Sequence, residues 1–138
     1  MHRTILYIFL LGCLALLHGC DDTKTAKDVE IKRQLEGAWT YEFQDVHGRT
    51  VSGLQTLKAD GKFLVNESKE HEVERSEGEW FVTDELLKQK TTQLEEKKLG
   101  TMQMLFFTCK ISELQANSFT CRDDVTKQSF FFKRSLAG

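Results

Sequence analysis

The chain has 138 residues, contains no proline and carries a formal net charge of −2 at neutral pH. This length suits one domain with a single core and leaves little room for two. With 40% hydrophobic and 29% charged residues, the composition is that of a globular protein and not of a disordered one. The near-neutral balance argues against a nucleic-acid-binding protein, which normally carries a basic excess or stripe.

The amino terminus has the pattern of an export signal. Arg3 precedes an uncharged apolar run over residues 5–17. The run is too short to span a bilayer, which needs about 20 residues, but it fits the apolar region of a secretory signal peptide. We therefore predict a lipoprotein signal peptide over residues 1–19, with a plain secretory signal or an uncleaved anchor as the alternatives.

The end of this segment, Leu17-His18-Gly19-Cys20, resembles the cleavage motif of bacterial lipoproteins. In that family the chain is cut before the cysteine, which then carries acyl chains such as palmitate that hold the protein at a membrane. A second match ends at Cys13, but cleavage there would leave an apolar stub, so Cys20 is the predicted lipidation site. Asp21 resembles an inner-membrane retention signal. The expected location is the bacterial cell envelope, facing the periplasm.

The mature chain is predicted to begin with a polar tether and a short helix. Residues 20–27 form the lipidated tether, and residues 28–138 form the folded domain. Apolar spacing predicts a helix over residues 28–35, which Gly37 can end. The period then changes to two, as in a half-buried strand, because apolar and polar or small residues alternate around Trp39, Tyr41 and Phe43.

Further alternating segments predict more strands, joined by short polar turns. Asp60-Gly61 is the strongest hairpin signal, and the acid-rich segment 67–79 is predicted to be a solvated hairpin. Residues 84–100 fit either an amphipathic helix or strands; we favour strands, because a helix would leave too few of them to close a sheet. The other predicted strands cover residues 49–58, 63–65, 77–82, 102–111, 118–122 and 129–134.

Many short strands with almost no helix indicate an all-β protein, either a sandwich or a barrel. The hairpin-by-hairpin order favours a small antiparallel up-and-down β-barrel of about eight strands with a short N-terminal helix. A barrel of this size is either filled with side chains or wide enough to hold one small ligand. The sequence leaves these two alternatives open.

Cys109 and Cys121 lie on consecutive predicted strands. A hairpin centred on Gln115 would place them directly opposite each other, and it would place Ile111 opposite Phe119 on the same buried face. Opposed residues of this kind come close enough for a disulfide, and an exported chain meets an oxidising compartment. We therefore predict a Cys109–Cys121 disulfide, with two buried free thiols as the alternative.

No pattern for catalysis or metal binding is visible. His47 and His71 remain after the predicted signal peptide, and neither lies in a motif with a nucleophile. No histidine or third cysteine has ligand spacing relative to the cysteine pair, and the segment 67–79 lacks a calcium-loop pattern. The sequence therefore predicts a protein that is not an enzyme, with no cofactor and no metal site.

Several segments between residues 35 and 134 are similar to small bacterial lipocalin-like lipoproteins. Leu35-Glu36-Gly37-Ala38-Trp39 looks like the G-x-W entry of lipocalins, and the likeness continues through residues 57–63, 78–86, 111–114, 118–119 and 132–134. The resemblance implies a compact antiparallel barrel in which Arg134 lies across Trp39 in a cation–π contact. It carries over no binding residues, because the family's ligand sites are not fixed by a motif.

Two functions suit such a barrel. One is binding of a small apolar ligand in the barrel mouth, which the resemblance favours. The other is binding of an envelope protein, as an inhibitor or assembly factor, through Phe131 or the segment 67–79 on the outside. The predicted partners are thus a membrane, through the anchor, and one of these two. The candidate ligand-binding residues are Trp39, Tyr41, Phe63 and Trp80.

Overall fold

The computed structural model describes residues 19–95, 97–98 and 105–136. The predicted signal peptide, including Cys13, therefore lies outside the described residues except at its last position. The predicted strand over 102–111 is described only from residue 105 onward. In the described ranges, no helix is long and apolar enough to cross a membrane.

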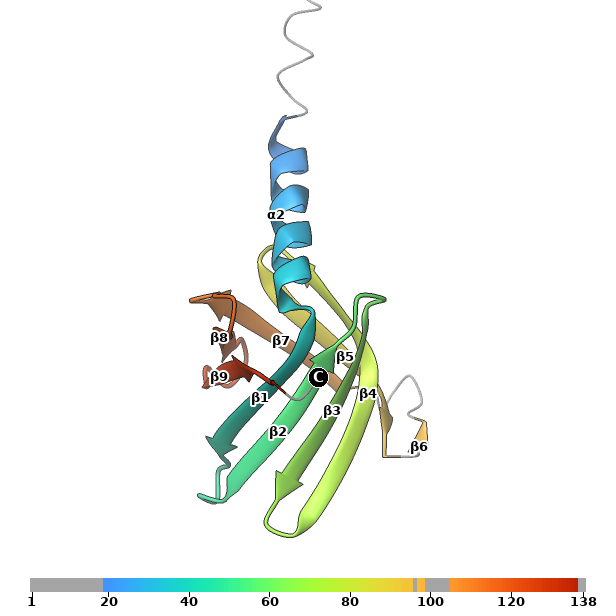
Figure 1. Cartoon of the computed structure of the whole chain (residues 1–138), viewed down its shortest axis with the longest axis vertical. Helices are drawn as coiled ribbons and strands as arrows, with labels where there is room; N and C mark the ends of the chain where they lie inside the picture. Colours follow the sequence, from blue (N-terminus) through green and yellow to red (C-terminus); the bar gives the residue numbers. More distant parts are fainter. Residues whose placement is uncertain (1–18, 96, 99–104, 137–138) are drawn as a thin grey trace, which may run out of the picture.

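The described chain forms one helix followed by nine strands (Figure 1). Helix α2 projects from one end of the strand layer, and consecutive strands run antiparallel. The bounds are α2 Gly19–Leu35, β1 Gly37–Gln44, β2 Thr50–Leu57, β3 Lys62–Lys69, β4 Glu72–Thr83, β5 Leu86–Leu94, β6 Lys97–Lys98, β7 Leu105–Ser112, β8 Ser118–Asp123 and β9 Ser129–Arg134.

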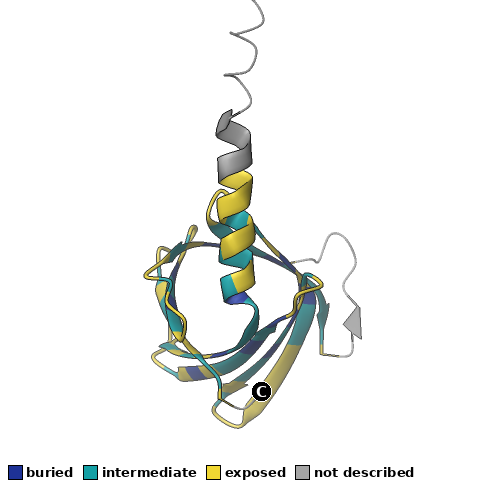
Figure 2. Ribbon diagram, turned by 45° about the horizontal axis from the view of Figure 1, so that its top comes forward, coloured by how far each residue is buried: buried dark blue, intermediate teal, exposed yellow. Residues whose placement is uncertain are grey.

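Eight of these strands close into a barrel, seen as a ring in Figure 2. Each strand pairs with the next along the chain, β5 pairs with β7, and β9 returns to pair with β1. Among the described residues, the short β6 pairs with the end of β5 and lies outside the ring. The predicted all-β, up-and-down antiparallel barrel with a helix before its first strand is confirmed.

Within the ambiguous segment 84–100, the residues that the structure describes form strands β5 and β6 and no helix, as favoured from the sequence. Thr83 pairs with Leu86, so Asp84 and Glu85 make a two-residue turn with φ angles of 55° and 62°. A left-handed backbone conformation at both central positions of a turn suits the right-handed twist of the adjoining strands. The Asp28 carboxylate of α2 accepts hydrogen bonds from both backbone N–H groups of this turn, each at 2.9 Å.

Helix α2 begins earlier than residue 28, where the sequence pattern placed its start. Residues 20–27, predicted as a tether, are helical. No glycine or proline interrupts residues 20–36, and the helix gains contacts with the β4–β5 turn. Lys24 pairs with Asp84, and the Lys27 ammonium lies 2.5 Å from the Glu85 carboxylate. The tether therefore continues the helix as a stalk above the barrel.

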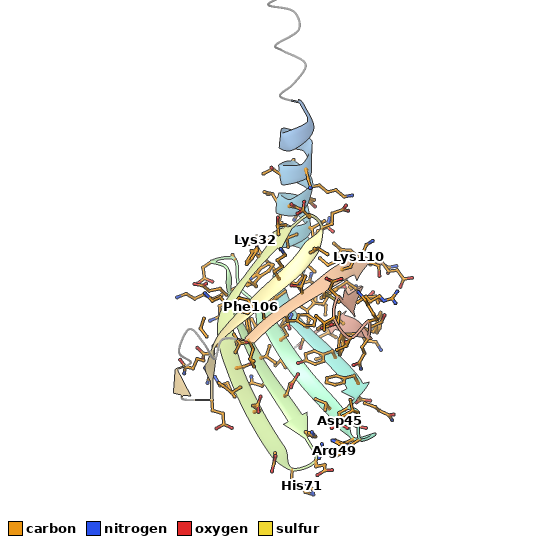
Figure 3. All side chains as sticks on the ribbon, turned by 180° about the vertical axis from the view of Figure 1, so that it is seen from behind. Lys32, Asp45, Arg49, His71, Phe106 and Lys110 are labelled. Atoms are coloured by element: carbon orange, nitrogen blue, oxygen red, sulfur yellow. A yellow bond between two sulfur atoms is a disulfide. The ribbon has the colours of Figure 1, made fainter. Side chains whose placement is uncertain are left out.

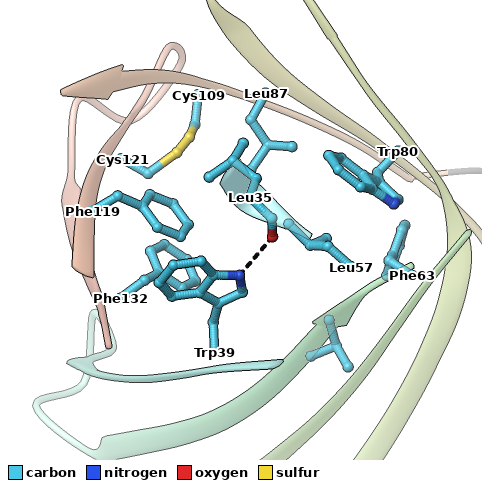
Figure 4. Close-up of a cluster of buried hydrophobic side chains, with 11 residues drawn as sticks. Leu35, Trp39, Leu57, Phe63, Trp80, Leu87, Cys109, Phe119, Cys121 and Phe132 are labelled. Carbon is cyan, nitrogen blue, oxygen red and sulfur yellow. Dashed lines mark hydrogen bonds between the residues drawn. A yellow bond between two sulfur atoms is a disulfide. The ribbon is translucent and has the colours of Figure 1, made fainter. Parts of the chain in front are cut away.

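The hydrophobic core fills the end of the barrel next to α2 (Figure 4). Leu35, the last residue of the helix, is fully buried there, and its carbonyl accepts a hydrogen bond from the Trp39 ring N–H at 2.7 Å. Phe119 packs edge-on against Trp39 and stacks on Phe132, with ring centroids 4.8 and 4.5 Å apart. This end of the barrel is therefore closed by side chains.

Arg134 clamps the helix end onto the closed barrel. Its guanidinium carbon lies 4.1 Å from the centroid of the Trp39 ring, as the lipocalin resemblance implied. Its three nitrogens donate to the backbone carbonyls of Gln34, Glu36 and Ala116 at 2.8–2.9 Å. Gly37 makes room for this arrangement, since a Cβ there would lie 2.5 Å from the guanidinium and its φ is +127°.

Cys109 and Cys121 are fully buried in the core, with Cα atoms 5.5 Å apart and sulfurs at bonding distance (Figure 4). The predicted register was wrong by two residues, because Cys109 pairs with Asp123, and Cys121 with Ile111. The tight turn lies at residues 115–118, where the Gln115 N–H donates to the Ser118 carbonyl, and is not centred on Gln115. A shift of two keeps every side chain on its face, so both cysteines still point inward.

Candidate functional site

The half of the barrel away from α2 contains a cavity of about 310 Å³. The barrel is therefore neither wholly filled nor wholly hollow: a core closes one end, and the other end is open. Aromatic side chains form much of the cavity wall, and the β8–β9 loop contributes Thr126 and Gln128 at its rim. The aromatic lining residues are Tyr41, Phe43, Phe63, Phe107, Phe130 and Phe132.

The structure separates the four candidate ligand-binding residues into two pairs. Tyr41 and Phe63 line the cavity, and Phe63 is also part of the buried core. Trp39 and Trp80 are 0% and 2% exposed and belong to the closed-end core, where the Trp80 ring N–H donates to the Lys58 carbonyl at 2.8 Å. All four side chains point into the barrel, so strand alternation alone could not divide them.

Tyr41 reaches across a neighbouring strand to Glu67. Tyr41, Gly53 and Glu67 occupy one row over β1, β2 and β3. A Cβ on Gly53 would lie 2.1 Å from the Tyr41 ring, so only glycine lets the ring lie over β2. The Tyr41 hydroxyl then donates to the Glu67 carboxylate at 2.5 Å. Burial, and next the negative charge of Glu67, raise the pKa of Tyr41 far above its ordinary value.

Two glutamines lie at the floor of the cavity, where it meets the core. Gln55 and Gln89 line the cavity and are only 4% and 7% exposed. Gln55 pairs with Trp39 across β1, and Gln89 pairs with Trp80 across β4. Alternation along β2 puts Gln55 on the inward face with Val51 and Leu57. A polar residue at an inward position was a signal that the sequence analysis missed.

Charged groups fix the β1–β2 turn at the end of the barrel away from the helix (Figure 3). The Asp45 carboxylate accepts hydrogen bonds from the backbone N–H groups of His47 and Arg49, and it pairs with the Lys69 ammonium at 2.9 Å. The hydrogen bond from Lys69, followed by the backbone donors, holds the pKa of Asp45 well below its usual range. The carboxylate therefore stays ionised and ties this turn to β3.

The cavity can surround an apolar molecule and can hydrogen-bond to a polar group on it. Its lining combines the aromatic wall with polar groups that include the buried amides of Gln55 and Gln89 and the hydroxyls of Ser76 and Thr91. His47 and His71 are absent from the lining. Over the described ranges, no three His, Cys, Asp or Glu side chains lie close enough to hold a metal ion.

No protein-family model matches the chain, and no curated protein matches its sequence. The barrel and the chemistry of its cavity therefore carry the functional argument.

Proposed function

We propose that this protein binds a small, largely apolar molecule in the open half of the barrel, as a binding protein and not as an enzyme. The cavity of about 310 Å³ with its aromatic wall supports this most directly. Its size falls at the small end of the range of ligand pockets, about 300–1,000 Å³. Removal of apolar ligand surface from water contributes roughly 25 cal/mol per Å² to such binding.

The test of this function is a change that fills the cavity. Ser76 lines the cavity, and a phenylalanine there would occupy part of its volume. We expect Ser76→Phe to weaken binding of an apolar fluorescent dye, such as N-phenylnaphthylamine, at least about tenfold, since ligand and side chain compete for one space. Fluorescence titration measures the affinity, and circular dichroism verifies the fold.

Ser68→Phe is the matched control for that substitution. Ser68 is exposed, and its position on β3 points outward, because inward-facing Phe63 and Val65 alternate with it. The control variant should bind the dye as the unaltered protein does. Undiminished binding by Ser76→Phe, or no binding by the unaltered protein, would overturn the proposed function.

We also propose that Cys20 carries a lipid anchor and that the barrel resides in the bacterial cell envelope, facing the periplasm; Asp21 favours the inner membrane. The sequence Leu17-His18-Gly19-Cys20 supports the anchor. Cys20 would begin the mature chain at the outer end of α2, a helix of 17 residues that rises about 25 Å from the closed end of the barrel. The cavity mouth would then face away from the membrane.

Lipidation is testable in a bacterial host supplied with labelled palmitate. The unaltered protein should incorporate the label and sediment with membranes, because several buried acyl chains give a stable anchor. Cys20→Ser should abolish both properties. Cys13→Ser is the matched control and should retain both. Label that persists in Cys20→Ser and disappears in Cys13→Ser would move the anchor to the earlier cysteine.

A second candidate function is binding of an envelope protein on the outside of the barrel. Phe106 on β7 and Phe131 on β9 are 73% and 49% exposed, although both are large and apolar. Exposed lysines lie on the same two strands: Lys110 comes four residues after Phe106 on β7 (Figure 3), and the Lys133 ammonium is 5.7 Å from the Phe131 ring centroid. This surface suits an acidic protein partner. Crosslinking that recovers no partner would count against it.

A further inference from the structure

Gln55 carries a buried hydrogen-bond donor without an acceptor. Its side chain is 4% exposed and lines the cavity, and its amide nitrogen has no hydrogen-bond partner among the described residues. A buried donor without a partner destabilises a protein, because the group has lost its hydrogen bonds to water. The position of Gln55 therefore points to an acceptor that arrives with a ligand.

The side chains that face Gln55 from the adjacent strands offer no hydrogen-bond acceptor. On the adjacent strands, Gln55 faces Trp39 on one side and Val65 on the other. The Trp39 ring offers only a donor, which is bonded to the Leu35 carbonyl, and Val65 is apolar. The Gln55 amide nitrogen therefore has no acceptor on either facing side chain, and one hydrogen bond to it would orient a bound molecule.

The charges in the wall disfavour an anion. Glu67 and Asp123 are the only charged side chains that line the cavity among the described residues, and both are acidic. Asp123 accepts hydrogen bonds from the backbone N–H groups of Val125 and Thr126 at 2.7 and 2.6 Å, and Glu67 accepts one from Tyr41. A carboxylate ligand would meet two negative charges and no positive one.

We propose that the cavity is selective for uncharged apolar molecules that carry one hydrogen-bond acceptor, such as a ketone oxygen, and that Gln55 receives this acceptor. The proposal rests on the proposed ligand-binding function and adds the polarity and charge of the ligand. Fatty acids and other apolar anions are then poor ligands. The aromatic side chains contact the apolar part of the molecule, and the hydrogen bond to Gln55 sets its orientation in the cavity.

Three probes with the same ring and the same number of non-hydrogen atoms test this selectivity: methyl naphthyl ketone, isopropylnaphthalene and naphthoate. With the unaltered protein, the ketone should bind about tenfold or more tightly than the hydrocarbon, because the hydrocarbon leaves the amide unpaired. Naphthoate should bind more weakly than the ketone by at least the same factor. Displacement of the fluorescent dye measures all three affinities.

Gln55→Met removes the donor and keeps the shape of the side chain. It should abolish the preference for the ketone over the hydrocarbon, because the ketone loses its hydrogen bond and the hydrocarbon no longer covers an unpaired donor. It should also raise the melting temperature of the unliganded protein, because an unpaired buried donor is gone. Gln44→Met is the matched control, since Gln44 is exposed on β1; it should alter none of these values.

The outcomes distinguish the proposed selectivity from the proposed ligand binding on which it rests. Equal affinity of the unaltered protein for ketone and hydrocarbon, or tightest binding of naphthoate, would overturn the inference and leave ligand binding intact. Failure of every probe and of the dye would overturn both. If Gln55→Met does not fold, the comparison of the three probes on the unaltered protein still decides the proposal.

Discussion

Replacement of Arg134 with methionine should lower the free energy of unfolding by about 2–4 kcal/mol. The guanidinium donates to three backbone carbonyls, those of Gln34, Glu36 and Ala116. Each carbonyl that loses a charged donor is destabilised, although water can reach part of this site and replaces some of the loss. The contact with the Trp39 ring, 4.1 Å away, adds about 0.5–2 kcal/mol.

Urea unfolding followed by tryptophan fluorescence measures this loss, with Lys133→Met as the control. Lys133 precedes Arg134 on β9 and is exposed, so its replacement should change stability by no more than about 0.5 kcal/mol. Arg134→Lys should recover only part of the loss, because an ammonium lacks the planar fork that spans three acceptors. Equal stability of Arg134→Met and Lys133→Met would show that the clamp contributes nothing.

Reduction of the Cys109–Cys121 pair should lower the free energy of unfolding by about 3 kcal/mol. The two cysteines are separated by 12 positions and are fully buried in the core. A crosslink over a loop of this length restricts the unfolded chain and so favours the folded state. Urea unfolding with and without dithiothreitol measures the difference.

A variant with alanine at both Cys109 and Cys121 is the control for reduction. It should unfold at one urea concentration whether or not reductant is present, and it should be less stable than the oxidised protein. The disulfide prediction would be wrong if reductant did not change the urea concentration at which the unaltered protein unfolds and if thiol labelling of the unfolded, unreduced protein detected both cysteines. The cysteines would then be free thiols.

The barrel could be predicted from the sequence because its strands are regular and consecutive. Trp39, Tyr41 and Phe43 alternate, the Asp60-Gly61 turn is distinctive, and each hairpin joins neighbours in the sheet. The β7–β8 register could not be predicted, because it depends on the position of one tight turn in a polar loop. The length of α2 could not be predicted either, since its first half is held by charges on the distant β4–β5 turn.

The sequence predicted a ligand site inside the barrel, but only two of the four candidate residues line the cavity. Inward-facing positions follow from alternation, and Tyr41 and Phe63 were found that way. The division between core and cavity depends on where α2 and Arg134 close the barrel, which no local pattern records. That is why Trp39 and Trp80 could not be told from Tyr41 and Phe63 before the structure was known.

The concentration of the core at one end has a consequence for engineering. Leu35, Trp39, the cysteine pair and Arg134 all lie next to the helix, whereas the cavity lies at the opposite end with the β8–β9 loop at its rim. Changes to the rim therefore leave the main stabilising contacts untouched. The open end can accept new side chains and loops, so this barrel is suited to the design of receptors for chosen small molecules.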